Sequence, residues 1–401
     1  MKKFSHSIKS ISISKLLNYH HHNNHNNDNQ WINGYNFYST YASSKTVRLK
    51  KSGDKNVICD FRSDTVTTPT LEMFNIMNKA SGGDDIFKDE STNDLENFMA
   101  DLTGHQAALF AVSGTMTNQI AIRTHLAQPP HSILCDARSH LHNYELGGVA
   151  YHSQATTIPI TPKNQIYLTA IDDLQPKIIK DDVYDVFSTP TKLISLENTL
   201  DGLVMPIEEI IQISKLSRST SIKTHLDGAR LWNASAATGI PIQDYCKYFD
   251  SVSLCLSKGI GAPIGSVLVG NQNFIDRARL FRRLFGGAWH QSGSLAAAAK
   301  YAIMTNFPNA IVHSHELTNQ LEKGLRHYGI TITKPVHTNM IFIDTKSINI
   351  TIKQLAEPLL KYGILISDDG LYSTRLVLNY QITKNAIDTF LKVVNDVIVG
   401  K

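Results

Sequence analysis

From Val57 onward, short apolar segments of strand length alternate with longer segments of helical periodicity. The apolar segments lie at residues 107–112, 132–135, 193–196, 222–226, 251–256 and 266–269. Segments with helical spacing lie between or after them, notably 115–125, 206–217 and 292–304. Strands separated by helices favour a mainly parallel sheet with helices on its faces. The pattern predicts an α/β domain.

After about residue 310 the pattern changes. A long helical segment at 311–328 is followed by short apolar segments at 340–344 and 376–379, and by a final helical segment at 384–399. This order is typical of a smaller α+β domain. We therefore expect a large domain at residues 57–310 and a small C-terminal domain at residues 311–401.

Residues 1–56 differ from the rest of the chain in composition. The run HHHNNHNNDN at residues 20–29 is polar and of low complexity, so it cannot bury apolar surface and is expected to be disordered. The basic, Ser-rich stretch before it is typical of an organelle transit peptide. Two interpretations stay open: a mitochondrial import segment, and a disordered extension of a cytosolic protein.

The net charge of +4 comes from this N-terminal segment. Residues 1–55 hold nine Lys and Arg against two Asp, whereas the remainder holds 30 basic against 33 acidic side chains. We therefore expect no nucleic-acid partner. No apolar run reaches the roughly 20 residues that a membrane span requires, and four widely spaced cysteines are typical of reduced thiols. A soluble intracellular protein is expected.

Several polar residues directly follow the expected strands, which is where open α/β sheets bind ligands. Ser113, Gly114 and Thr115 lie between the strand at 107–112 and the next helix. A helix that begins this way presents free backbone N–H groups to an anion such as a phosphate, and Thr115 can cap it. A simple helix cap is the alternative interpretation.

Asp227 ends one expected strand, Lys258 follows another and His140 follows a third. Each has an ordinary explanation when taken singly: a salt bridge of Asp227 with Arg230, a solvated lysine, and one of 17 histidines. A lysine in a Gly/Pro-rich turn after a buried strand can also act as a neutral amine and form a Schiff base. Taken together, four features describe a pyridoxal-phosphate site. They are a phosphate cradle formed by the backbone after the strand at 107–112, His140 stacked on the cofactor ring, Asp227 at the ring nitrogen and Lys258 as the Schiff-base amine.

Six segments resemble the low-specificity L-threonine aldolases, which are pyridoxal-phosphate enzymes of fold type I. They are DFRSDTVT at 60–67, SGTMTN at 113–118, SLENT at 195–199, HLDGAR at 225–230, CLSKGIGAPIGS at 255–266 and GGAWHQSG at 286–293. The resemblance runs from about Cys59 to the C-terminus. It implies a large domain with a mainly parallel seven-stranded sheet flanked by helices, plus a smaller α+β domain.

The resemblance also implies roles for individual residues around the cofactor. Lys258 would form the Schiff base, and Asp227 would pair with the pyridinium nitrogen. His140 would stack on the ring, and Gly114 and Thr115 would bind the phosphate. We assign no metal ligands.

The resemblance also implies that two arginines and one serine lie at the substrate carboxylate. Arg230 would lie near the cofactor O3′ and the substrate carboxylate, which Ser63 and Arg375 would hold, the latter from the small domain. The family is usually a homotetramer of catalytic dimers. The expected partners are therefore an amino-acid substrate and further copies of the chain.

Some positions depart from the family pattern. His290 stands where the family usually has an arginine that contacts the cofactor phosphate of the neighbouring subunit. Tyr184 is the best match to a second active-site histidine, Phe87 replaces a tyrosine, and Leu200 replaces the histidine after the ENT motif. Apart from His290, these departures lie on the substrate side, while the residues assigned to the core of the cofactor site match the family.

The implied reaction is retro-aldol cleavage of L-threonine or L-allo-threonine to glycine and an aldehyde. His140, or a water that it positions, would take the β-hydroxyl proton, with Lys258 and Asp227 acting on the cofactor. Because one fold hosts many chemistries, β-elimination, racemisation and transamination stay open as alternatives. A non-catalytic binding protein is a further alternative.

Overall fold

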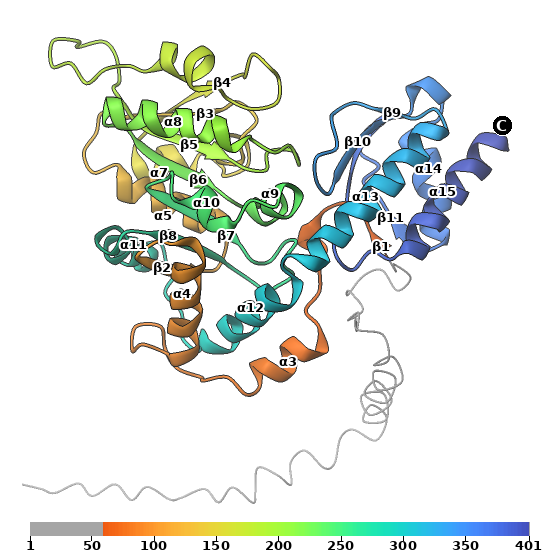
Figure 1. Cartoon of the computed structure of the whole chain (residues 1–401), viewed down its shortest axis with the longest axis horizontal. Coiled ribbons are helices and arrows are strands. Elements are labelled where there is room, and N and C mark those ends of the chain that lie inside the picture. Colours follow the sequence, from red (N-terminus) through yellow and green to blue (C-terminus); the bar gives the residue numbers. More distant parts are fainter. Residues whose placement is uncertain (1–58, 401) are drawn as a thin grey trace, which may run out of the picture. The chain divides into compact units, whose positions relative to one another are not determined.

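The computed structural model describes residues 59–400. The segment 1–56, expected to be disordered or a transit peptide, lies outside the described residues. Figure 1 shows a large sheet with helices around it and a second, smaller group of C-terminal elements. None of the helices within residues 59–400 is long and apolar enough to cross a membrane.

The large sheet has seven strands in the order β2-β8-β7-β6-β5-β3-β4. Neighbours from β7 to β4 run parallel, whereas β8 runs antiparallel to both β2 and β7. The short connection at 256–265 explains the exception, because a parallel return would need a crossover of a dozen or more residues. The strands are β2 (Ala107–Ala111), β3 (Ser132–Asp136), β4 (Thr156–Ile160), β5 (Thr191–Glu197), β6 (Lys223–Asp227), β7 (Ser251–Cys255) and β8 (Ser266–Gly270). The expected mainly parallel, seven-stranded sheet is confirmed.

One strand of the large sheet was not expected from the sequence. β4 lies at the edge of the sheet and buries only Ile160, so no apolar run marks it. The helices flanking the sheet enclose an apolar core with residues such as Phe110, Trp232 and Tyr245. The helices of this part of the chain are α3 (Leu71–Met77), α4 (Glu90–Thr103), α5 (Gly114–His125), α6 (His140–Asn143), α7 (Gly148–Ser153), α8 (Ile207–Thr220), α9 (Leu231–Thr238), α10 (Ile242–Cys246), α11 (Gln272–Leu284) and α12 (Gly293–Asn306), of which α3 packs on α12 rather than on the sheet.

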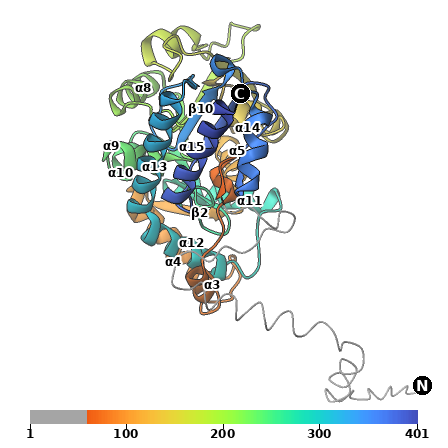
Figure 2. The same ribbon diagram turned by 90° about the vertical axis from the view of Figure 1, so that its right-hand side faces the viewer.

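The C-terminal elements form a three-stranded antiparallel sheet in the order β12-β10-β9. Figure 2 shows the C-terminal helices α13, α15 and α14 side by side. The strand expected at 376–379 is wrong in its bounds, because the register with β10 pairs residues 373–377 instead. The elements are α13 (Asn309–His327), β9 (Thr331–Ile332), β10 (Met340–Asp344), α14 (Ile352–Lys361), β11 (Ile364–Leu365), β12 (Ser373–Val377) and α15 (Lys384–Val399).

The first described strand belongs with these C-terminal elements. β1 (Cys59–Asp60) pairs in parallel with β11, and Phe61 is buried against Phe390 with ring centroids 5.5 Å apart. The chain therefore crosses from the small core into the large one after Phe61. The division at 57–310 and 311–401 stays a prediction.

Candidate active site

The carboxyl ends of neighbouring strands bring the predicted lysine and aspartate together. Asp227 is the last residue of β6, and Lys258 lies in the turn three residues after β7 ends. The charges of both act on the buried Cys255 thiol, whose pKa is raised chiefly by burial, and on the carboxyl of Glu197. An amine and an acid from adjacent strands thus share one site.

Asp227 is held rigidly at this site. Its side chain is buried, Oδ1 accepts from the backbone N–H of Ala229 at 3.0 Å, and Oδ2 accepts from Asn118 Nδ2 at 2.8 Å. Hydrogen bonds to both oxygens orient the carboxylate and leave further lone pairs for a cationic ring nitrogen. An acceptor placed in this way fits the protonated pyridine nitrogen of pyridoxal phosphate.

His140 lies beside Asp227. It is the first residue of α6, and its Nδ1 lies 2.9 Å from Oε1 of the buried Glu145. A ring nitrogen of His140 and one carboxylate oxygen each of Glu145 and Asp227 all lie within 4.8 Å of one another. The His140 side chain keeps 38% of its surface exposed, so it can meet a ligand.

The turn after β2 matches a phosphate cradle. A Cβ built on Gly114 would lie only 2.5 Å from Cys255 Sγ, so the backbone here approaches the end of β7 as only glycine allows. The prediction that Thr115 caps the helix is wrong. Ser113 is the N-cap, and its hydroxyl accepts from the backbone N–H of Met116, because the helix begins one residue earlier than expected. Thr115 lies in the first helical turn, where backbone N–H groups still favour an anion.

Arg230 forms a buried ion pair with Asp64. Its Nε and Nη2 donate to the two carboxylate oxygens at 2.8 and 2.6 Å, and Asn339 Nδ2 lies 3.4 Å from Oδ2. Burial alone would raise the pKa of Asp64, but the charge and hydrogen bonds of Arg230, with Lys258 and Asn339, hold it below its usual value. Asp64 thereby joins Arg230, three residues after the end of β6, to Asn339 of the C-terminal elements.

The two residues predicted to hold a substrate carboxylate lie on hydrogen-bonded segments. The backbone N–H of Val377, at the end of β12, donates to the Phe61 carbonyl at 2.7 Å. Ser63 follows Phe61 by two residues, and Arg375 precedes Val377 by two. Both side chains are partly exposed. Their binding of a carboxylate stays a prediction.

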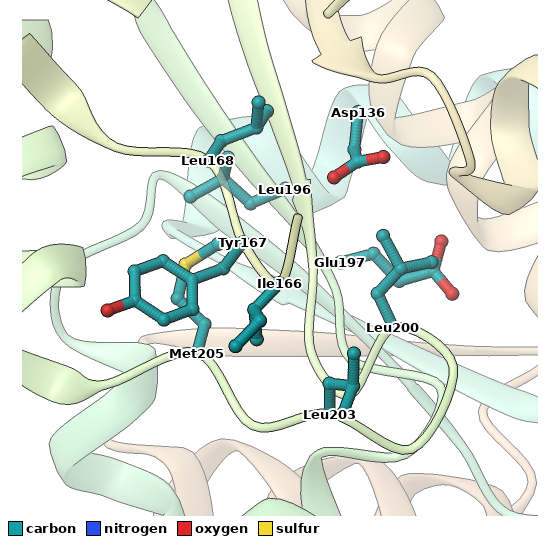
Figure 3. A pocket seen from close by; sticks show the side chains of 9 residues that line it. All are labelled: Asp136, Ile166, Tyr167, Leu168, Leu196, Glu197, Leu200, Leu203 and Met205. Atoms are coloured by element: carbon teal, nitrogen blue, oxygen red, sulfur yellow. The ribbon is translucent and has the colours of Figure 1, made fainter. Parts of the chain in front are cut away.

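Glu197, at the end of β5, is a further carboxyl of the site. Its Oε2 accepts from the backbone N–H of His140 at 2.8 Å. Burial raises its pKa to about 8 and the charge of Asp227 adds to this, while the His140 N–H, Lys258 and Arg230 act in the opposite direction. Figure 3 shows Glu197 with Asp136 among the mainly apolar side chains that line a small pocket.

Because the pKa of Glu197 is raised, its contribution to stability should depend on pH. The folded protein binds a proton here that the unfolded chain releases near pH 4.5, so this stabilisation is present below 4.5 and is lost as pH rises to about 8. Over this pH window we expect the free energy of unfolding to fall by on the order of 2 kcal/mol more in the wild type than in Glu197→Gln. This figure allows for the partial exposure of Glu197. Urea unfolding at pH 5 and pH 8 measures the difference. The control is Glu357→Gln, at an exposed site on α14, which should show the same change in the free energy of unfolding between pH 5 and pH 8 as the wild type. If Glu197→Gln also shows the wild-type change, the raised pKa does not belong to Glu197.

Three of the four positions that depart from the family pattern lie at the surface, whereas Leu200 is buried. The side chains of Phe87 and Tyr184 are 84% and 89% exposed. His290 is also exposed, and its Nδ1 contacts Asp84. Neither aromatic side chain therefore has a place among the buried site residues of this chain.

Four polar residues of the site were missed by the sequence reasoning: Asp64, Asn118, Glu145 and Glu197. All but Glu145 lie within segments that had been singled out. A usable signal existed for Asn118, because it lies one helical turn after Gly114 and so on the same face of α5. Asp64 and Glu197 could have been suspected as carboxylates adjoining Ser63 and the end of a buried strand.

A lysine and an aspartate after adjacent strands of such a sheet, with a glycine cradle opposite, define the pyridoxal-phosphate enzymes of fold type I. The model of the beta-eliminating lyase family matches residues 60–347. The probable low-specificity L-threonine aldolase of Schizosaccharomyces pombe is 45% identical over 82% of this chain and 84% of its own. The low-specificity L-threonine aldolase of Saccharomyces cerevisiae is 44% identical over 82% of this chain and 84% of its own.

The fold comparison agrees. The solved structure of the threonine aldolase of Leishmania major superimposes with a TM-score of 0.72 at 19% identity, covering 85% of this chain and 99% of that one. The chain belongs to the low-specificity L-threonine aldolases, within the beta-eliminating lyase family.

Proposed function

We propose that this protein cleaves L-threonine and L-allo-threonine to glycine and acetaldehyde. The observation that carries the proposal is the convergence of Lys258, Asp227 and His140 beside a glycine cradle. The relatives named for this reaction support it, since the matched region includes all three residues. When bound, pyridoxal phosphate supplies an aldehyde that condenses with amines and a ring that takes up the electron pair of the broken bond.

Residues of the chain hold the cofactor and accept the substrate proton. Lys258 would anchor the cofactor through its amine, and Asp227 would keep the ring nitrogen protonated. Gly114 and Thr115, at the start of α5, would hold the phosphate, and His140 would lie against the ring and accept the β-hydroxyl proton, directly or through a water.

Arg230, Ser63 and Arg375 bind the substrate side. Arg230 is a cation that Asp64 holds in place, so its guanidinium enters the site already oriented. Ser63 and Arg375 reach the carboxylate from the two segments joined at Phe61 and Val377. Fixing the carboxylate sets which substituent of the α-carbon is cleaved.

We also propose that the working enzyme is an intracellular homotetramer built from dimers. Several large apolar side chains, among them Leu146, Tyr151 and Leu284, are mostly exposed in the single chain, and a second copy would cover them. Cys135, Cys246 and Cys255 are buried thiols, which suits a reducing compartment, either the cytosol or the mitochondrion.

Product analysis tests the reaction. The purified, cofactor-loaded protein is incubated with L-threonine and separately with L-allo-threonine. Glycine and acetaldehyde in equal amounts are the expected products. β-Elimination is the second candidate, because the matching family is described by that reaction, and ammonia with a 2-oxo acid would favour it instead.

A further inference from the structure

Glu145 is a buried carboxylate surrounded by nitrogen donors. Its Oε1 lies 2.9 Å from both His140 Nδ1 and Asn118 Nδ2, and its Oε2 lies 2.5 Å from Gln119 Nε2. The residue lies between α6 and α7, and its side chain has no exposed surface. A carboxylate has no hydrogen to donate, so in these three contacts the nitrogens present hydrogens to it.

The direction of these hydrogen bonds is fixed by Asn118. Its Nδ2 contacts two carboxylates, Glu145 at 2.9 Å and Asp227 at 2.8 Å, so its two hydrogens go one to each. Its Oδ1 must then accept, and it lies 3.1 Å from His225 Nε2. The reversed amide would face both carboxylates with an oxygen.

His225 is consistent with this direction. Burial lowers its pKa to about 4, so the ring is neutral and carries one hydrogen. That hydrogen lies on Nε2, toward Asn118, which leaves Nδ1 to accept from the Ser251 hydroxyl at 2.8 Å. The chain of donors therefore runs from Ser251 through His225 and Asn118 to the two carboxylates.

We propose that Glu145 is a positioning residue for His140. It holds the ring with a hydrogen on Nδ1, so that Nε2 is the nitrogen that exchanges a proton with the substrate, and Asn118 ties this pair to Asp227. A base oriented by a buried carboxylate is a recurring arrangement in enzymes that activate hydroxyl groups. The inference deepens the proposed function and rests on it for the role of the proton.

The first test measures His140 in the cofactor-free protein, without any turnover. Diethyl pyrocarbonate acylates unprotonated imidazole nitrogens, and trypsin releases His140 and the exposed His142 on one peptide, residues 139–163. The ratio of their acylation rates, measured by tandem mass spectrometry, reports on His140 with an internal reference. Because the carboxylate makes Nε2 more nucleophilic, Glu145→Gln should lower the ratio about threefold or more.

Two further variants separate positioning from general loosening. Glu145→Asp withdraws the carboxylate by roughly 1.5 Å and should give an intermediate ratio. Glu96→Gln removes another buried glutamate, which pairs with Arg279 and is not part of the site, and should leave the ratio unchanged. A wild-type ratio in either Glu145 variant, or an equal fall in Glu96→Gln, would overturn the proposal.

The second test uses the cofactor-loaded enzyme. Glu145→Gln should lower kcat for threonine cleavage about 10- to 100-fold, as removing the orienting partner of a functional histidine commonly does. KM and the dissociation constant of pyridoxal phosphate, followed by visible absorbance, should each stay within about threefold, because Lys258 and Asp227 are retained. A purely structural role would instead weaken cofactor binding and kcat together.

The two tests fail differently. If the wild type cleaves no β-hydroxy amino acid, the proposed function fails, while the acylation ratio still reports whether Glu145 orients His140. If the wild type yields glycine and acetaldehyde but Glu145→Gln keeps both the ratio and kcat, the positioning role alone is removed.

Discussion

Replacing Lys258 by alanine is expected to abolish the visible absorbance of bound pyridoxal phosphate and to reduce threonine cleavage by on the order of 10³-fold or more. Lys258 is the amine in the turn after β7 whose charge reaches both Cys255 and Glu197. Without it, neither the covalent anchor nor the amine that releases the product is present. The absorption spectrum and acetaldehyde production of the purified variant measure the two effects.

Lys223→Ala is the matched control. Lys223 begins β6, the strand that ends at Asp227, and pairs with Asp250 at the other end of the strand, with 57% of its side chain exposed. It should keep the spectrum and the activity of the wild type. A Lys258→Ala variant with an unchanged spectrum and full turnover would remove the assignment of Lys258 as the anchor.

The features that could be predicted from the sequence are those set by local patterns. Apolar runs of strand length marked six of the seven large-sheet strands, and a polar residue directly after such a run must lie at the carboxyl edge of a parallel sheet. This is why Asp227 and Lys258 could be expected to meet, although 30 residues separate them. β4 was missed because an edge strand that buries one side chain leaves no apolar run.

The contacts that orient the site could not be predicted in this way. Asn118 reaches Asp227 across 109 positions of sequence, and Asp64 reaches Arg230 across 166. Such partners are chosen by the packing of α5 on the sheet and of the C-terminal elements on η1 (Asp64–Val66), and no periodicity in the chain records either. The capping hydroxyl was misplaced for a related reason, because Ser113 and Thr115 are equally good caps and backbone geometry decides between them.

The buried pair of Asp64 and Arg230 leads to the largest expected effect on stability. Asp64→Asn should lower the free energy of unfolding by about 3–5 kcal/mol, because it leaves the Arg230 guanidinium, only 13% exposed, without its counter-charge. Because the pKa of Asp64 lies below its usual value of 3.8, the pair is fully ionised at neutral pH, so the loss should be complete there. Urea unfolding of the cofactor-free protein at pH 7 measures it.

Asp244→Asn separates burial from the mere loss of an ion pair. Asp244 pairs with Lys247 on the surface, and both side chains are about half exposed, so its replacement should cost less than about 0.5 kcal/mol. If Asp64→Asn costs no more than this, water must reach the pair. Asp64 would then not be what fixes Arg230 between β6 and the C-terminal elements, and the proposed orientation of that guanidinium toward the substrate would lose its physical basis.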